Sequence, residues 1–311
     1  MKTTPVTASD IPRSVLSVPP LARRADCSID REQNKRILDH LRTGGVSTFM
    51  YGGNANFYNL PVSEFAPLLE MLEEVAGADD WIIPSVGSDY GKAMDQIAIL
   101  RGLRFPTAMV LPHRFPATAA GVATGIRRLA DLYQRPVIAY VKDDGYIDAE
   151  DLGRLAADGA ICGIKYAIVR ANPEIDPYLE QVLSVVDRKM VISGIGERPA
   201  IAHLMQFKLP GFTSGSVCIA PRLSTMLLES LKRGDVKEAE RLRRLFLPLE
   251  DLRDAHSPLR VLHEAVRLAG IAETGPILPY LSNITAPVLV AAIEQAAKRL
   301  LEANAGARKA A

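Results

Sequence analysis

The sequence is poor in the features that mark several broad classes of protein. It contains three cysteines, Cys27, Cys162 and Cys218, which are far apart and form no CxxC pair. An odd and scattered set of thiols provides no disulfide framework, so we expect unpaired cysteines in a reducing compartment. Every apolar run is shorter than the roughly 18 residues of a membrane-spanning helix, so we expect no membrane contact.

Neither sign of charge is in excess. The 37 basic and 36 acidic side chains give a formal net charge of +1. Proteins that bind the nucleic-acid backbone concentrate Lys and Arg, so we expect no nucleic-acid partner. Residues 1–24 contain Lys2 and the pair Arg23 and Arg24 but no continuous apolar stretch. We therefore find no signal peptide and expect a cytoplasmic protein.

Motifs for metal binding and for a serine nucleophile are also lacking. The histidines form neither HxH nor HExxH, and no serine lies in a GxSxG turn. We therefore expect no metal ion. His113 follows a predicted strand, and the other four lie in predicted helices, where they serve packing or the surface: His40, His203, His256 and His263.

Short β-rich runs alternate along the chain with longer segments of helical period. The predicted strands cover residues 14–18, 46–51, 81–86, 107–111, 137–141, 161–165, 190–193 and 211–217. Most are nearly continuous apolar runs, as expected for strands that are covered on both faces. The predicted helices between them cover residues 30–43, 62–75, 91–103, 117–132, 148–157, 175–186, 198–206 and 221–232.

Regular alternation of strand and helix predicts an α/β protein, a (β/α)8 (TIM) barrel over residues 14–234. An open doubly wound sheet is the alternative, but no Gly-rich turn follows the first strand. The remaining segments predict a C-terminal extension of three helices, residues 236–247, 256–269 and 286–303, within residues 235–303. We expect residues 1–13 to be a flexible lead-in and residues 304–311 a tail.

Active sites of such barrels lie at the carboxyl ends of the strands, and Lys165 ends the sixth predicted strand. If its side chain points inward, desolvation lowers the pKa of the amine, which can then attack a carbonyl carbon. If it points outward, Lys165 is a surface lysine whose stem packs between helices. Either orientation fits the sequence pattern.

Tyr140 lies in the fifth predicted strand, next to the strand of Lys165. A phenol beside an amine can relay protons during imine chemistry. The alternative is a core tyrosine whose hydroxyl is satisfied by the fold. The two residues on neighbouring strands together favour a site. The turns at residues 193–196 and 211–216 could instead bind phosphate on their backbone N–H groups.

Short motifs lie at the ends of the predicted strands or just after them. In chain order they are residues 52–56 with Leu60, residues 85–87, Tyr140 to Asp143, Gly163-Ile164-Lys165, and Ser193-Gly194. In this order and spacing the chain resembles the dihydrodipicolinate synthase / N-acetylneuraminate lyase family of class I aldolases and dehydratases. The resemblance spans roughly residues 14–303. Asp143-Asp144 and residues 211–215 are similar to loops of the keto-deoxyglucarate dehydratases in that family.

The resemblance implies roles for particular residues. Lys165 would form an imine with a 2-oxo acid such as pyruvate or a keto-deoxy sugar acid, and Tyr140 would relay protons. The lysine would serve as the electron sink, so no cofactor is expected. Gly53 and Asn54 stand where the family has two threonines that hold the substrate carboxylate. Further substrate-binding candidates are Arg114, Lys142, Gly194 and Thr213.

Three departures from the family pattern bear on the substrate. Neither threonine is present, and Arg114 stands where the synthases supply a tyrosine across a dimer contact. The arginine that binds the second carboxylate in the synthases has no counterpart, although Lys142 or Arg114 could substitute as cations. These departures argue against the lysine-pathway synthase. We expect a Schiff-base lyase, an aldolase or dehydratase, that acts on pyruvate or a small keto-deoxy sugar acid.

Two alternatives stay open at this point. One is dihydrodipicolinate synthase itself. The other is a barrel that binds a small acid without turnover, although such a module has no need of a buried amine. The resemblance also implies a homo-oligomer, either a dimer or a tetramer.

Overall fold

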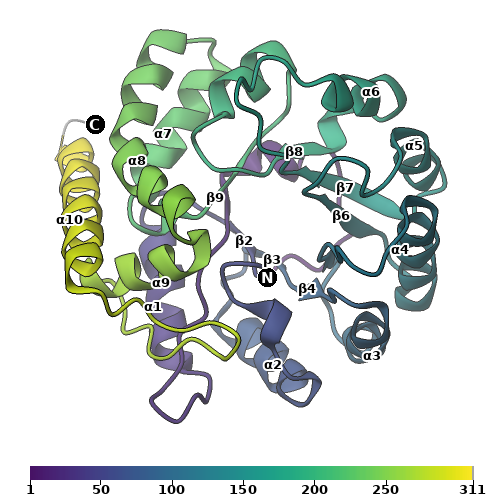
Figure 1. The fold of residues 1–311 in the computed structure, drawn as a ribbon, viewed down its shortest axis with the longest axis horizontal. Coiled ribbons are helices and arrows are strands. Elements are labelled where there is room, and N and C mark those ends of the chain that lie inside the picture. The colour runs from purple at the N-terminus through teal and green to yellow at the C-terminus, as the bar shows by residue number, and fades with distance from the viewer. Residues whose placement is uncertain (310–311) are drawn as a thin grey trace.

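A ring of parallel strands with helices around it forms the centre of the molecule in the computed structural model, which describes residues 1–309 (Figure 1). The strands belong to two sheets, ordered β3-β2-β1-β9 and β4-β5-β6-β7-β8. Their bounds are β1 Leu16–Ser17, β2 Thr48–Met50, β3 Trp81–Ile83, β4 Ser85–Val86, β5 Met109–Val110, β6 Val137–Val141, β7 Ile161–Tyr166, β8 Val191–Ser193 and β9 Thr213–Ser214.

The two sheets join into a closed barrel at two points. Only Pro84 separates β3 from β4, so these two elements are halves of one barrel strand. A parallel bridge between Ser193 and Phe212 links β8 to β9. The described residues therefore contain the eight strand positions of a (β/α)8 barrel, as the sequence predicts.

Helices follow the strands and form the outer layer (Figure 1). Their bounds are α1 Arg31–Arg42, α2 Phe65–Val75, α3 Tyr90–Arg101, α4 Ala119–Tyr133, α5 Ala149–Ala157, α6 Pro177–Val185 and α7 Pro221–Lys232. Side-chain caps start several of them. Asp30 accepts from the backbone N–H of Gln33, for example, and satisfies a donor that the first helical turn leaves free.

One predicted helix, residues 198–206, begins two residues later than expected and is mainly a π-helix. After Ser193 the chain turns through residues 194–199, residues 200–201 are helical, and the π-helix follows over Ala202–Gln206. Pro199 lacks a backbone N–H, which suits its place at the start of this helical segment. The irregular turn accompanies a buried contact, in which His203 Nδ1 lies 2.8 Å from Ser193 Oγ.

The lead-in, residues 1–13, packs against the barrel. Lys2 N donates to Asp80 O at 2.7 Å, just before β3, and Lys2 also pairs with Asp10. Ile11 is only 1% exposed and reaches Gly211, just before β9. These contacts lie at the amino-terminal ends of the strands, so residues 1–13 cover the end of the barrel opposite the expected site.

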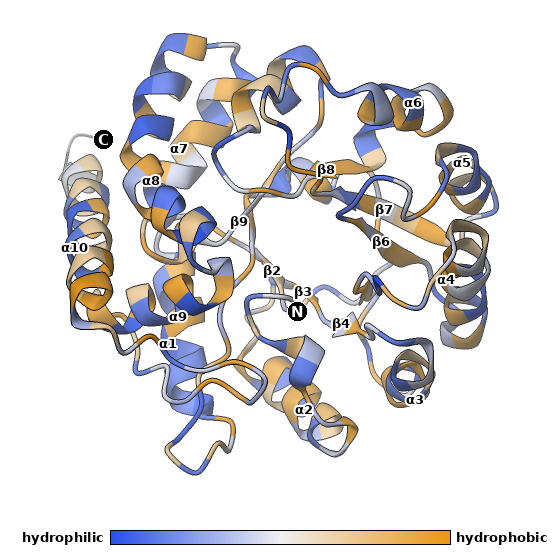
Figure 2. Ribbon diagram, viewed as in Figure 1, coloured by the Kyte–Doolittle hydropathy of each residue, from blue (hydrophilic) through white to orange (hydrophobic). Residues whose placement is uncertain are grey.

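The core lies between the strands and the helices. Figure 2 shows β6 and β7 as hydrophobic along most of their length, whereas the surrounding helices combine both kinds of residue. All five residues of β6 are buried. Strands covered on both faces need this composition, which is why the apolar runs locate them in the sequence.

Three helices extend the barrel on one side: α8 Val236–Ala255, α9 Pro258–Leu268 and α10 Pro287–Lys309. The last one continues beyond the predicted end at residue 303, so residues 304–309 are helical and not a separate tail. Residues 310–311 of that predicted tail lie outside the described part of the chain. Asn304 ties α10 to the barrel, because its Oδ1 accepts from Arg222 N at 2.9 Å.

Candidate active site

Strand register places Lys165 and Tyr140 side by side. In the parallel pair of β6 and β7, Tyr140 lies opposite Lys165. The register shifts earlier in the pair, where Val137 faces Ile161 and Ile138 faces Gly163, so Cys162 is an extra residue on β7. This bulge sets the alignment, since without it Tyr140 would face Ile164.

Lys165 points into the barrel. It is 3% exposed, and its Nζ lies 4.4 Å from the centroid of the Tyr140 ring. Desolvation, together with the charges of Lys142 and Arg253, lowers the pKa of Lys165 to about 7. The aromatic face favours the ammonium form, but desolvation outweighs that preference. A large share of the amine is therefore uncharged and nucleophilic near neutral pH.

Tyr140 is buried beside this amine, at 9% exposure. Burial, followed by the nearby Asp143 carboxylate, raises the pKa of Tyr140 to about 12. The phenol therefore keeps its proton at neutral pH and can donate it to a developing oxyanion. Tyr58, which sequence reasoning missed, lies close enough for the two phenols to influence each other.

A cavity of about 480 Å³ opens above Lys165 and brings the predicted site residues together. It lies at the carboxyl ends of the strands, where the fold predicts a site. Every predicted residue except Arg114 lines it: Gly53, Asn54, Tyr140, Lys142, Lys165, Gly194 and Thr213.

Arg114 lies apart from this lining. Its side chain is exposed, and its Nε and Nη2 each donate to the Asp143 carboxylate at 2.9 Å. Asp143 thus satisfies the guanidinium that we expected to bind substrate. Lys142 does line the cavity. Although its side chain reaches solvent, partial desolvation and the charge of Arg114 lower the pKa of its ammonium.

Gly194 is required for the approach of β7 to the turn after β8. A Cβ on this residue would lie 2.7 Å from Tyr166 O and 3.0 Å from Lys165 Cγ. A larger residue would therefore push against the lysine stem. In this chain the glycine of the Ser193-Gly194 pair therefore has a packing role that the sequence alone did not reveal.

A buried ionic network from α8 completes one wall of the cavity, and the sequence did not reveal it. Glu250 and Arg253 line the cavity, with Arg253 Nη1 2.6 Å from Glu250 Oε1. Ser216 donates to the same carboxylate. Behind it, Glu197 accepts from Ser224 at 2.8 Å, and burial next to Glu250 raises the pKa of Glu197 to about 7.

The same network argues against phosphate binding at the turn of residues 193–196. A Cβ on Gly196 would lie 3.1 Å from Glu250 Oε2, so a carboxylate already faces this turn. A second anion there would be repelled. Among the described residues, no group of three or more His, Cys, Asp or Glu side chains could hold a metal ion. The three cysteines are free thiols, as the sequence predicts.

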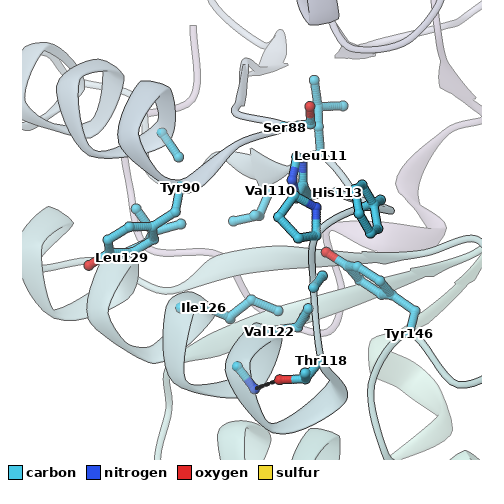
Figure 3. Close-up of a pocket in the computed structure, with 16 residues that line it drawn as sticks. Ser88, Tyr90, Val110, Leu111, His113, Thr118, Val122, Ile126, Leu129 and Tyr146 are labelled. Atoms are coloured by element: carbon cyan, nitrogen blue, oxygen red, sulfur yellow. Dashed lines mark hydrogen bonds between the residues drawn. The ribbon is translucent and has the colours of Figure 1, made fainter.

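A second cavity, of about 520 Å³, lies between α3 and α4 (Figure 3). Its walls are mostly apolar, and His113, Ser88 and Tyr146 contribute polar groups. Neither Lys165 nor Tyr140 lines it, so His113 does not share the cavity of the buried amine. Figure 3 also shows the Thr118 hydroxyl, which accepts from Gly121 N at 3.1 Å and caps α4.

Fold and site together define a class of protein. Lys165 is a desolvated lysine on β7, which is the sixth barrel strand when β3 and β4 count as one, and a (β/α)8 barrel with such a lysine has the arrangement of a Schiff-base enzyme. The chain belongs to the dihydrodipicolinate synthetase family, whose model matches residues 14–296. It is a lyase of this family. No helix among the described residues is long and apolar enough to cross a membrane.

Known proteins extend this comparison. The chain is 25% identical, over 88% of its length and 84% of the relative's, to a probable 5-dehydro-4-deoxyglucarate dehydratase of Streptomyces coelicolor. It is 22% identical to the 4-hydroxy-tetrahydrodipicolinate synthase of Chlorobaculum parvum, covering 88% and 93% of the two chains. The dihydrodipicolinate synthase structure from Oceanobacillus iheyensis shares the fold, with TM-score 0.82, 22% identity and 94% and 97% coverage.

Proposed function

We propose that the protein is a Schiff-base lyase that acts on a keto-deoxy sugar acid through an imine on Lys165. The observation that carries the proposal is the buried amine beside Tyr140, whose pKa of about 7 leaves it nucleophilic. The Streptomyces coelicolor relative is named a dehydratase of such an acid. Pyruvate, the shortest 2-oxo acid with a ketone carbonyl, would form the same imine.

The proposed reaction begins when the neutral Lys165 amine attacks the carbonyl carbon. The carbonyl oxygen takes up one proton that the amine nitrogen gives up and one from Tyr140, and it leaves as water, which gives a protonated imine and a Tyr140 phenolate. The imine withdraws electrons from the neighbouring carbon, which loses a proton and forms an enamine. The enamine then expels the β-hydroxyl as water in a dehydratase, or arises by carbon–carbon cleavage in an aldolase. Hydrolysis of the imine releases the product and restores the amine.

Borohydride trapping tests this proposal. The protein is incubated with pyruvate or a keto-deoxy sugar acid, reduced, and weighed by mass spectrometry. We expect one adduct per chain in the wild type and none in Lys165→Ala. Lys142→Ala is the matched control, because it removes the other lysine of the cavity and should keep the adduct. A wild type that forms no adduct with any 2-oxo acid would favour a binding barrel without turnover.

Synthase activity is the second candidate, because the Chlorobaculum parvum relative is named 4-hydroxy-tetrahydrodipicolinate synthase. Such an enzyme would use the pyruvate enamine to attack an aldehyde substrate. Coupled assays in the two directions separate the candidates. We expect turnover of a keto-deoxy sugar acid and none of pyruvate with an amino-acid semialdehyde.

We also propose a homo-oligomer in the cytoplasm. Phe115 is 85% exposed and Tyr90 44% exposed beside the apolar cavity of Figure 3, and burying both in a contact between copies would be favourable. Free thiols suit a reducing compartment. Light scattering should give a molar mass that is a multiple of 33.8 kDa.

A further inference from the structure

Arg253 presents an unused donor to the cavity from outside the barrel. The residue is 7% exposed and lies near the end of α8. Its Nη1 donates to Glu250 Oε1 at 2.6 Å, and its Nε donates to Pro258 O at 3.3 Å. Within residues 1–309 its Nη2 has no hydrogen-bond partner. Because Nη1 and Nε both have hydrogen-bond partners, the guanidinium plane is fixed and Nη2 is oriented before a ligand binds.

A second hydrogen-bond donor, Asn54 Nδ2, lies near Arg253 Nη2 in the wall of the cavity. A Cβ on Gly215 would lie 2.5 Å from Arg253 Nη2 and 2.9 Å from Asn54 Nδ2, so only glycine leaves room for both groups. Asn54 Nδ2 donates to Val18 O at 2.8 Å. This bond uses one of its two N–H groups and leaves the other available.

We propose that Arg253 and Asn54 together hold the carboxylate that is attached to the carbonyl carbon of the substrate. This site would replace the two threonine hydroxyls that the family uses and this chain lacks. The inference rests on the proposed function. It assigns to the C-terminal extension a direct part in substrate binding, because Arg253 belongs to α8 and not to a barrel strand.

Charge and reach both favour this role. Arg253 contributes to the lowered pKa of Lys165, so its charge lies within electrostatic reach of the amine. A carboxylate bound next to the imine carbon would therefore feel both cations. Glu250 does not saturate the guanidinium, which has more N–H groups than its present contacts use. Hydrogen bonds from a guanidinium to a carboxylate are also stronger than those from a neutral hydroxyl.

Pyruvate is the decisive probe, because its only carboxylate is the one next to the carbonyl. The measurement is the pyruvate concentration that gives half the maximal rate of borohydride trapping. We expect Arg253→Gln to raise this concentration roughly 10- to 100-fold, and Arg253→Lys to raise it less. Trapping of acetone, which has no carboxylate, should fall far less than trapping of pyruvate, because it reports only on the amine, whose pKa Arg253 also lowers.

Two further variants separate binding from damage to the buried network. Arg253→Gln leaves Glu250 as an unpaired buried carboxylate, which can destabilise the site by itself. Glu250→Gln combined with Arg253→Gln removes that charge, and we expect the weak pyruvate binding to persist. Arg241→Gln is the matched control: it breaks a Glu–Arg pair of the same spacing in α8, with Glu238, at the exposed surface.

Gly215→Ala tests the geometry without removing a charge. The backbone φ of Gly215 is −87°, which alanine adopts readily, so the added Cβ acts only on its neighbours. Displacement of the guanidinium should weaken pyruvate binding as Arg253→Gln does.

The inference is overturned if the double variant binds pyruvate within about threefold of the wild type, or if only longer acids lose affinity. In the second case Arg253 would act on a distant group of the substrate. If the wild type forms no pyruvate adduct at all, the proposed function fails instead.

Discussion

Lys165 and Tyr140 are the two side chains that we propose to carry the chemistry of this site, and burial shifts the pKa of each. Desolvation lowers the pKa of the lysine and raises that of the phenol, so at neutral pH the phenol is protonated and a large share of the amine is uncharged. The amine can then attack, and the phenol can donate. Arg253, Asn54 and Lys142 supply the charged and polar groups around them.

Tyr140→Phe tests the phenol. The ring stays against Lys165 Nζ, but the hydroxyl that would relay protons is lost. We expect kcat with a keto-deoxy sugar acid to fall about 10²–10⁴-fold, with borohydride trapping of pyruvate still possible because the amine remains. Steady-state kinetics and mass spectrometry give the two readouts. A loss in kcat of less than about threefold would remove Tyr140 from the reaction.

At the scale of elements, the sequence predicted most of the secondary structure. Strands covered on both faces are apolar runs, and caps such as Asp30 mark helix starts, so these elements follow from local pattern. The bulge at Cys162 does not, because register depends on which residue of β7 faces β6. The network of Glu250 and Arg253 was also missed. Its Glu–Arg spacing equals that of the exposed pair Glu238 and Arg241 in the same helix. Only the packing of α8 against the barrel, which buries one pair and leaves the other in solvent, distinguishes them.

Site residues were predictable where a strand end fixes them. Gly53, Asn54, Lys142 and Gly194 follow strands, Thr213 lies in β9, and all five line the cavity above Lys165. Arg114 also follows a strand, but its long side chain folds onto Asp143 in the next loop. The backbone position of such a residue is set by the barrel, whereas the direction of its side chain is set by partners that the pattern does not reveal.

The start of α7 offers a prediction at this scale. Its N-cap residue, Ala220, has no side-chain acceptor, and Asn304 of α10 supplies one to Arg222 N at 2.9 Å and Leu223 N at 3.3 Å. We expect Asn304→Ala to lower the free energy of unfolding by about 1 kcal/mol. Asn304→Asp keeps an acceptor and should remain close to the wild type. Thermal unfolding of the three proteins checks this, and equal melting temperatures would contradict it.

The stability of the whole molecule should depend on pH through Lys165. Its pKa is about 7 when folded and 10.5 as a free group, so between these values the unfolded chain binds more protons. Stability attributable to this group therefore rises with pH across that window. Below about pH 7 both states are protonated, and the folded protein bears the whole cost of a buried ammonium.

Lys165→Met removes this cost while keeping the length of the side chain. We expect the variant to melt at least about 2 °C above the wild type near pH 6, with a smaller difference near pH 9.5. Scanning calorimetry at the two pH values measures both differences. A gain that is the same at both, or larger at the higher pH, would contradict a buried amine with a lowered pKa.

The pairing of Tyr140 with Lys165 has an evolutionary consequence. Backbone hydrogen bonding between two adjacent strands sets their spacing, so the surrounding loops and the appended helices can vary in length and composition without disturbing it. New acids can then be accommodated by altering those outer parts alone. A pair of residues whose spacing is set by the sheet can be inherited unchanged while the residues that determine substrate preference change.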